Sequence, residues 1–167
     1  GMIHAAGIVE PAPLRDLSWA SFQRVMAPKL QGSWQLHTLL QAAGMAATLD
    51  FCVYFSSASA VLDTSGVGSY AAANAFLDGL AAYQRAAGLP AVSINWGPWD
   101  EAGMADAYRV AAAEATPVRN QGMGLISAPQ GLALLETVLQ QAVAQVAVLP
   151  VNWGRYRRLV PTAQAAH

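Results

Sequence analysis

The sequence predicts one α/β domain with a doubly wound parallel sheet, in which helices cover both faces of the strands. Hydrophobic residues make up 54% of the 167 residues and charged residues only 11%, which indicates large buried surfaces rather than disorder. The stretches that look like strands are apolar throughout, as is typical of parallel strands buried on both faces. They alternate with stretches of helical periodicity, which favours a three-layer α/β/α arrangement.

Two strands and a long helical segment are predicted in the first part of the chain. Residues 1–7 (GMIHAAG) are apolar and end in small residues, which predicts a buried strand whose end allows close approach. Residues 16–44 follow a helical period, and Pro28 should kink this segment because proline removes a backbone hydrogen bond. Residues 49–59 begin as a β-rich run and end in small hydroxyl residues, which predicts the second strand.

The second part of the chain repeats the alternation. Helix signals are clear where Gly88 can end a helix and where Ser127 can serve as an N-cap. Residues of about 100–127 show no single period, which predicts a partly helical cover, or lid. The other elements expected are a helix over 69–88, a strand over 90–99, a helix over 127–142 and a last strand over 143–153.

Composition excludes several classes of function. The net charge of −1 offers no electrostatic attraction to nucleic acid or to an anionic membrane, so neither partner is predicted. No apolar run reaches the roughly 18–20 residues that span a bilayer. The single cysteine, Cys52, lies in an apolar strand and is consistent with a cytoplasmic location. No metal site is predicted.

Polar and small residues follow each predicted strand. The strand ends are HAAG, FSSAS and NWGPW. In a doubly wound sheet the carboxyl ends of parallel strands share one edge, and ligands bind there. The sequence therefore predicts one site built from all three strand ends.

The segment Gly66-x-Gly68-x-x-Ala71 looks like a dinucleotide-binding loop, but its setting is wrong. Such a loop turns directly from a strand into a helix and has an acidic residue about 20 positions later. Here the glycines come about nine residues after the strand, and no acid lies near 88–96. We interpret them as loop-forming residues.

Four residues support a second hypothesis, in which they form a site that donates a proton to a carbonyl group. Tyr70 and Asn74 lie four apart on one helix face. Ser57 ends a strand, and Lys29, the only lysine among nine basic residues, lies at the predicted kink. A nearby ammonium favours the phenolate form of a tyrosine, which suits proton transfer. Each residue taken alone more often has a structural role, and their combination leaves both interpretations open.

Several longer motifs occur in a fixed order along the chain. They are HAAG, A-P-K-x-x-G-x-W, FSS, Y-A-x-x-N-x-F-L-D and W-G-x-W. In these motifs the chain closely resembles the C-terminal, catalytic half of a ketoreductase domain from a modular type I polyketide synthase. That family belongs to the short-chain dehydrogenase/reductase superfamily, so the resemblance implies a Rossmann-like fold.

The resemblance implies NADPH-dependent reduction of a β-ketoacyl thioester carried by an acyl carrier protein. Tyr70 would protonate the carbonyl oxygen, Ser57 would hydrogen-bond it, and Lys29 and Asn74 would complete the relay, in positions exchanged relative to ordinary superfamily members. The cofactor would lie against Ala5, Ala6, Gly7, Lys29, Tyr70, Trp96, Gly97, Pro98 and Trp99. Met104 would begin the lid over the acyl chain.

Two stereochemical markers of the family are missing. The Leu-Asp-Asp of B-type members reads Val9, Glu10, Pro11 here, and the tryptophan of A-type members is Leu62. The resemblance also places residues 1–7 on the fourth strand of the family fold. We therefore expect the nucleotide-binding loop on an N-terminal half outside this chain, and a long apolar edge strand where that half would pair. Two alternatives stay open: a non-catalytic scaffold half of a synthase, and a stand-alone reductase of a small ketone.

Overall fold

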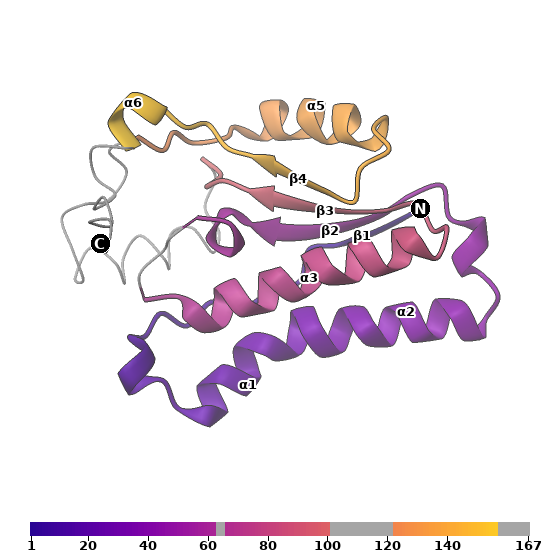
Figure 1. Ribbon diagram of the computed structural model, residues 1–167, viewed down its shortest axis with the longest axis horizontal. Coiled ribbons are helices and arrows are strands. Elements are labelled where there is room, and N and C mark those ends of the chain that lie inside the picture. Colours follow the sequence, from indigo (N-terminus) through magenta and orange to yellow (C-terminus); the bar gives the residue numbers. More distant parts are fainter. Residues whose placement is uncertain (63–65, 101–121, 157–167) are drawn as a thin grey trace, which may run out of the picture.

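The computed structural model describes residues 1–62, 66–100 and 122–156. Its centre is a parallel sheet of four strands in the order β1-β2-β3-β4 (Figure 1). The strands are β1 (Met2–His4), β2 (Cys52–Ser57), β3 (Ala91–Trp96) and β4 (Gln145–Val148). Because all four run in one direction, their carboxyl ends lie at the same edge of the sheet.

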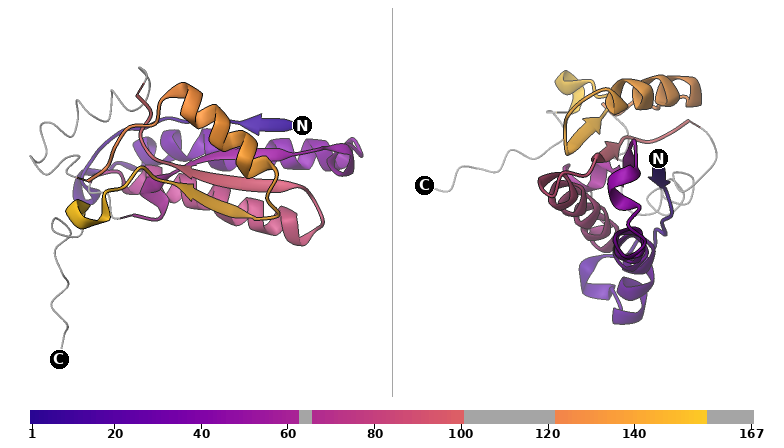
Figure 2. Two further views of the ribbon diagram at one scale, coloured as in Figure 1. Left: turned by 90° about the horizontal axis from the view of Figure 1, so that it is seen from above. Right: turned by 90° about the vertical axis from the view of Figure 1, so that its right-hand side faces the viewer.

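Helices cover both faces of this sheet, which confirms the predicted α/β/α layers. The long helix α3 (Gly68–Ala86) packs on one face, with α1 (Trp19–Ala27) and α2 (Ser33–Ala42) on the same side. Helix α5 (Ala128–Leu139) covers the other face (Figures 1 and 2). The regular structure of the described residues also includes a short helix, α6 (Trp153–Tyr156), a π-helical turn, Pro28–Gly32, and three 3-10 turns, Leu14–Asp16, Ala46–Thr48 and Ala58–Ala60.

The core lies in two clusters because successive strand residues point to opposite faces. Cys52 and Tyr54 of β2 pack under α3, against Leu77 and Leu80. The alternate strand residues point to the other face of the sheet and pack under α5. They form a cluster with residues of the α5 region: Val53, Val92, Ile94, Trp96, Ile126 and Val138. The apolar strands of the sequence are thus explained by burial on both sides.

Glycines and caps set the helix boundaries where the sequence predicted them. Gly66 has φ +79° in the turn before α3, and Gly88 has φ +84° just after it, so both take conformations that suit glycine. At the start of α5 the backbone N–H of Ser127 donates to Oε1 of Gln130, at 3.1 Å. Gly66 lies in the turn before α3 and Gly68 is the first residue of that helix, so neither glycine follows a strand directly.

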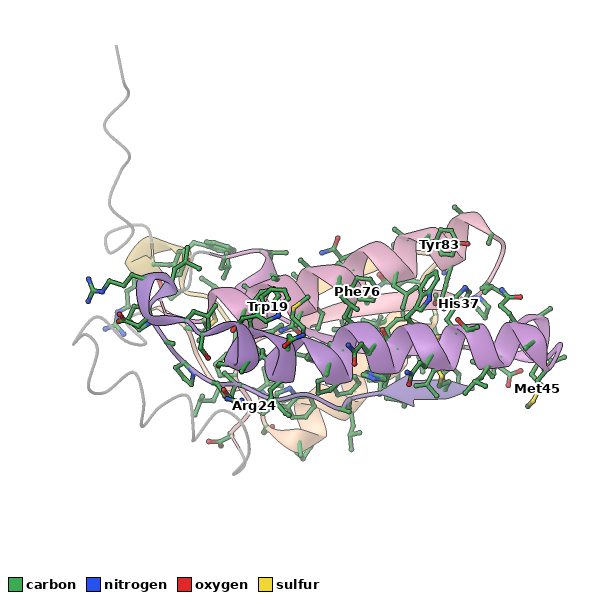
Figure 3. All side chains as sticks on the ribbon, turned by 90° about the horizontal axis from the view of Figure 1, so that it is seen from below. Trp19, Arg24, His37, Met45, Phe76 and Tyr83 are labelled. Atoms are coloured by element: carbon green, nitrogen blue, oxygen red, sulfur yellow. The ribbon has the colours of Figure 1, made fainter. Side chains whose placement is uncertain are left out.

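A buried polar cluster joins α2, α3 and β2 at the amino end of the sheet. The side chain of Gln84 accepts a hydrogen bond from the Tyr54 hydroxyl at 3.0 Å and lies 2.9 Å from Nδ1 of His37. His37 and Tyr83 face each other with ring centroids 5.8 Å apart (Figure 3). Since buried polar groups need partners, this cluster fixes how the helix pair sits on the strand.

Three element boundaries differ from the prediction. The last strand ends at Val148, well before residue 153, because Pro150 has no backbone N–H to continue the ladder. The kink predicted at Pro28 is a π-helical turn, Pro28–Gly32, that connects α1 to α2. The edge strand β1 has only three residues, so the expected long edge is short. No helix among the described residues is long and apolar enough to cross a membrane.

Two helix glycines give a matched test of this packing. A Cβ on Gly131 of α5 would lie 2.1 Å from Cη2 of Trp99, whereas nothing lies within 4 Å of one on Gly79 of α3. We expect Gly131→Ala to lower the free energy of unfolding by about 1–3 kcal/mol, because the indole must move. Gly79→Ala should raise it by up to about 1 kcal/mol. Urea unfolding of both variants followed by tryptophan fluorescence measures this, and similar effects from the two substitutions would contradict the packing.

Candidate functional site

The residues that the sequence singled out gather at the carboxyl edge of the sheet. Ser57 ends β2 and is paired in register with Trp96, which ends β3. His4 ends β1 and leads into Ala5, Ala6 and Gly7. The prediction of one shared edge is confirmed for these strand ends.

Lys29 is brought to this edge by the π-helical turn, and its side chain is only 1% exposed. Its ammonium donates a hydrogen bond of 2.7 Å to the backbone carbonyl of Phe55. The same nitrogen lies 5.8 Å from the centroid of the Tyr70 ring. A π turn rotates its residues relative to a regular helix, and such turns are frequent at functional sites. Lys29 is therefore directed inward, whereas a lysine on the protein surface would point to solvent.

Burial lowers the pKa of Lys29 to about 8, and the negative charge of Asp78 partly opposes this shift. Water solvates an ammonium better than the protein interior does, so burial favours the neutral amine. The resulting pKa lies close to neutral pH. Small changes in the surroundings of Lys29 can therefore change its charge.

Tyr70 stands in the first turn of α3, half-buried. Burial raises the pKa of its phenol, while hydrogen bonding with Asn74 and Ser57 lowers it. The Asn74 amide also donates to the backbone carbonyl of Tyr70 at 2.7 Å. Tyr70 and Ser57 thus meet at the edge of the sheet, as the sequence predicted, and the phenol stays protonated at neutral pH.

Asn74 is completely buried, and its Oδ1 has no hydrogen-bond partner among the described residues. An unsatisfied buried oxygen is costly, on the order of 1–3 kcal/mol. It is an acceptor available to a water molecule or to a ligand group at this edge.

Ser57 and its neighbour Ser56 point to different partners. The hydroxyl oxygen of Ser57 accepts hydrogen bonds from the N–H and the hydroxyl of Ser59, at 3.2 and 3.1 Å. The Ser56 hydroxyl is buried and donates to the carbonyl of Asn74 at 3.2 Å. Ser57 is therefore the serine that the structure leaves half-exposed at the edge.

The segment expected to border a nicotinamide lies at the same edge. The Trp96 ring packs in the cluster under α5, with centroids 5.4 Å from Phe55 and 5.0 Å from Trp99. The N–H of Gly97 donates to the carbonyl of Val148 at 2.9 Å, and Pro98 follows it. A contact of these residues with a cofactor stays a prediction.

The remaining predicted residues fall around this centre. Ala5 and Ala6 are exposed, Gly7 is half-exposed, and Leu62 follows the 3-10 turn after Ser57. Met104 and the lid over about 100–127 fall largely outside the described residues. Glu10, at a missing marker position, accepts two hydrogen bonds of 2.9 Å from Arg24 and so ties the loop after β1 to α1.

Sequence reasoning missed four polar residues near the site, of which His4, Ser93 and Asn95 are buried and Asp78 is half-buried. His4 is 6% exposed, and both burial and the charge of Lys29 lower its pKa. The other three, Asp78, Ser93 and Asn95, are hydrogen-bonded to one another between α3 and β3. A signal was present, because Tyr70, Asn74 and Asp78 are spaced by four, and Ser93 and Asn95 by two.

These residues make the two faces of the sheet differ in character. Under α5 the strand residues are mainly apolar, and the indole N–H of Trp96 in that cluster has no hydrogen-bond partner among the described residues. Under α3 the alternate positions near the strand ends are polar, with Ser56, Ser93 and Asn95 all buried. Since side chains alternate along a strand, one sequence can build an apolar core on one face and a polar platform on the other. Tyr70 and Asn74 stand on the polar platform.

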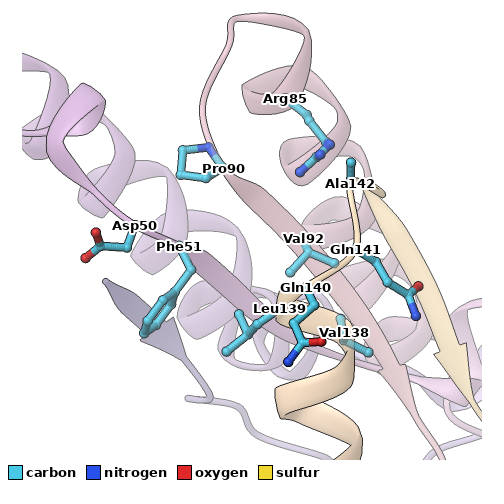
Figure 4. Close-up of a pocket in the computed structure, with 10 residues that line it drawn as sticks. All are labelled: Asp50, Phe51, Arg85, Pro90, Val92, Val138, Leu139, Gln140, Gln141 and Ala142. Atoms are coloured by element: carbon cyan, nitrogen blue, oxygen red, sulfur yellow. The ribbon is translucent and has the colours of Figure 1, made fainter.

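A pocket lies at the opposite, amino end of the strands (Figure 4). It is lined by residues that precede β2, β3 and β4, among them Phe51, Pro90 and Gln141, and by residues of α3, β3 and α5. None of the predicted site residues lines it. Since ligands of parallel α/β sheets bind beyond the carboxyl ends, the candidate site remains at the other edge.

Comparisons with known proteins agree with this geometry. The sequence model of the KR domain family matches residues 1–101. The chain is 42% identical over 139 residues to a phenolphthiocerol/phthiocerol polyketide synthase of Mycobacterium tuberculosis, covering 83% of this chain and 6% of that protein. The chain belongs to the ketoreductase domains of polyketide synthases. These domains belong to the short-chain dehydrogenase/reductase superfamily, and this chain has the same Rossmann-like α/β fold as they do.

Another polyketide synthase and two solved ketoreductase structures agree with this assignment. Polyketide synthase GfsE of Streptomyces halstedii is 41% identical over 142 residues, which are 83% of this chain and 4% of that protein. Among solved structures, A-type ketoreductases from a modular polyketide synthase superpose with a TM-score of 0.80 at 34% identity, over 92% of this chain and 31% of theirs. The first ketoreductase of the tylosin synthase gives 0.77 at 34% identity, over 93% and 33%. This ketoreductase chain thus spans about a third of the solved chains.

The buried ammonium of this ketoreductase chain should reduce its stability in a pH-dependent way. The pKa of Lys29 falls from its ordinary 10.5 to about 8, a difference of about 3 kcal/mol. Below pH 8 both folded and unfolded states hold the proton, so the full cost is present. Between pH 8 and 10.5 the folded state releases the proton first, so the cost declines as pH rises. We expect Lys29→Met to be more stable than the parent by up to about 3 kcal/mol at pH 7, with little advantage near pH 10.5.

Urea unfolding at both pH values measures this difference. Arg15→Met is the matched control, because the Arg15 side chain is 84% exposed. Its effect should be small and equal at the two pH values. A Lys29→Met protein that is no more stable than the parent at pH 7 would contradict a charged, buried Lys29.

Proposed function

We propose that this chain carries the catalytic residues of an NADPH-dependent reductase that converts a β-ketoacyl thioester on an acyl carrier protein into a β-hydroxyacyl thioester. One observation carries the proposal above all: the only lysine of the chain is buried beside the Tyr70 ring at the carboxyl edge of the sheet. Family membership supports the reaction class.

Tyr70 is the proton donor in this proposal. Burial raises the pKa of its phenol, so the hydroxyl still holds its proton at neutral pH and can give it to an oxygen that becomes negative. Ser57, which hydrogen-bonds with the same phenol, donates a second hydrogen bond to that oxygen. Two donors aimed at one developing oxyanion stabilise the transition state more than the ground state.

Asn74 and Lys29 assist the return of a proton from solvent to the Tyr70 phenolate. The Oδ1 of Asn74, which has no partner among the described residues, accepts a hydrogen bond from a water that leads toward bulk solvent. The Lys29 ammonium stabilises the negative charge that Tyr70 carries after transfer. Both residues act through hydrogen bonds and charge, so neither forms a covalent bond.

The residues at the edge fit a nicotinamide cofactor. Ala5, Ala6 and Gly7 present little side-chain bulk at the end of β1, which permits a flat ligand to approach the backbone. Lys29 would hold the nicotinamide ribose. When bound, the cofactor supplies a hydride to the carbonyl carbon.

The nucleotide end of the cofactor needs residues that this part of the fold does not offer. The glycines at 66 and 68 open α3 after a loop, and β1 is an edge strand whose Ile3 is 49% exposed. We propose that a segment supplying three further strands pairs with β1 and brings the phosphate-binding loop. Other synthase domains and the carrier protein complete the assembly, in a cytoplasmic setting.

Tyr70→Phe tests the assignment of the proton donor. We expect a loss of ketone reduction by at least about a hundredfold, because the ring stays but the transferable proton is gone. NADPH oxidation with a β-ketoacyl thioester measures it, in the reductase reconstituted from this chain and a nucleotide-binding segment. Tyr83→Phe, on the exposed side of the same helix, should keep near-parental rates. An active Tyr70→Phe enzyme would refute the role.

The chain by itself should bind NADPH weakly. The pyrophosphate and the 2′-phosphate supply much of the affinity of a dinucleotide through a glycine loop and a helix N-terminus. Calorimetric titration of the 167-residue chain should give no tight binding, and addition of the strand-supplying segment should restore it. Comparable affinities with and without that segment would count against a divided site.

A further inference from the structure

Ser33 places a completely buried hydroxyl directly after the π-helical turn that carries Lys29. It is the first residue of α2, and its backbone N–H donates to the carbonyl of Leu30, three residues earlier. Its side-chain hydroxyl donates to the backbone carbonyl of Lys29, four residues earlier. In a regular α-helix the backbone N–H binds the carbonyl four residues back. Here the Ser33 hydroxyl binds that carbonyl.

Two threonines make the same kind of hydrogen bond within regular helices. The hydroxyl of Thr38 in α2 donates to the carbonyl of Trp34 at 2.9 Å. The hydroxyl of Thr137 in α5 donates to the carbonyl of Ala133 at 3.0 Å. Both threonines are exposed, so water can take the place of either hydroxyl. Ser33 is shielded from water, and loss of its hydroxyl would leave a buried carbonyl short of a donor.

Lys29 is thereby held at both of its ends. Its backbone carbonyl binds the Ser33 hydroxyl, and its ammonium donates to the carbonyl of Phe55 at 2.7 Å. The turn also lies against β1, since a Cβ on Gly32 would be 3.5 Å from Nε2 of His4. The backbone of the turn is therefore fixed by the sheet on one side and by Ser33 at its end.

The direction of the Lys29 side chain depends on this turn. A π turn closes its hydrogen bond over one residue more than an α-helical turn does, and each residue of an α-helix rotates the chain by about 100°. Relaxation of Pro28–Gly32 to a regular helix would therefore turn Lys29 away from Phe55 and Tyr70.

We propose that Ser33 is a positioning residue, whose hydroxyl holds the π turn in the form that directs Lys29 to the carboxyl edge of the sheet. The consequence for catalysis rests on the proposed function. The direction of Lys29 does not, because it is measurable without substrate or cofactor.

The chain offers selective probes, because it contains one lysine and one cysteine. Reductive methylation modifies Lys29 and the α-amine of the exposed Gly1, so the ratio of the two rates, read by mass spectrometry, reports access to Lys29. We expect Ser33→Ala to raise this ratio by roughly tenfold, since a lost hydrogen bond that leaves a buried carbonyl unpaired shifts an equilibrium by about that factor. Thr38→Ala removes the matching bond from a regular helix and should leave the ratio unchanged.

Two further readouts separate a turned lysine from general unfolding. Cys52 is buried in the core, so its reaction with a thiol reagent should stay slow in Ser33→Ala. Protein labelled with ε-¹³C-lysine gives one side-chain resonance, which should titrate with a pKa of about 8 in the parent. In Ser33→Ala this pKa should move toward the ordinary 10.5, because an ammonium that reaches water is no longer desolvated.

Unchanged reactivity and titration of Lys29 in Ser33→Ala would overturn the proposal. A rise in reactivity that Thr38→Ala or Cys52 shares would do the same, because Lys29 would then be exposed by loosening of the whole domain. If Ser33→Ala yields too little folded protein, Ser33→Cys fills the same space with a much weaker donor and should move the titration in the same direction. Should Tyr70→Phe prove active, these measurements would still decide the role of Ser33.

Discussion

The burial of the Lys29 ammonium is the constraint on which the carboxyl edge of this sheet depends. A charge moved from water into a protein needs an acceptor in contact and an opposite charge nearby. The acceptor is the Phe55 carbonyl at 2.7 Å, from the middle of β2. The π-helical turn after Pro28 directs the side chain there. Helix, strand and proposed catalytic residues are therefore arranged around one cation.

The sequence predicted the layers, the parallel strands and most helix limits, because these depend on local signals. Gly88, Ser127 and the apolar runs act over a few residues, and the structure follows them. The length of β1 and the end of β4 were wrong, since a strand extends only where a neighbour pairs with it. Pro150 shortened β4, although the residues around it are apolar.

The residues proposed to carry the chemistry of the candidate site were predictable from the sequence, whereas the residues that support them were much less so. Lys29 stood out as the only lysine, and Tyr70 with Asn74 by their spacing. Asp78 and Asn95 also had regular spacing, but a carboxylate four residues from Asn74 more often faces solvent. Their partnership requires β3 to lie beside β2 and beneath α3, which is a property of the whole fold. Side chains that meet across three elements give no local pattern to read.

The free-energy cost of the buried polar groups at the carboxyl edge of the sheet favours a catalytic role over a scaffold role. The ammonium of Lys29 is buried, and His4 Nδ1 and Asn74 Oδ1 have no partners among the described residues. Each unsatisfied buried group costs on the order of 1–3 kcal/mol, in a domain whose total stability is only about 5–15 kcal/mol. A scaffold could hold the same strands and helices with apolar residues at these positions. A fold that keeps three costly polar groups at one edge is better explained by a reaction that uses them.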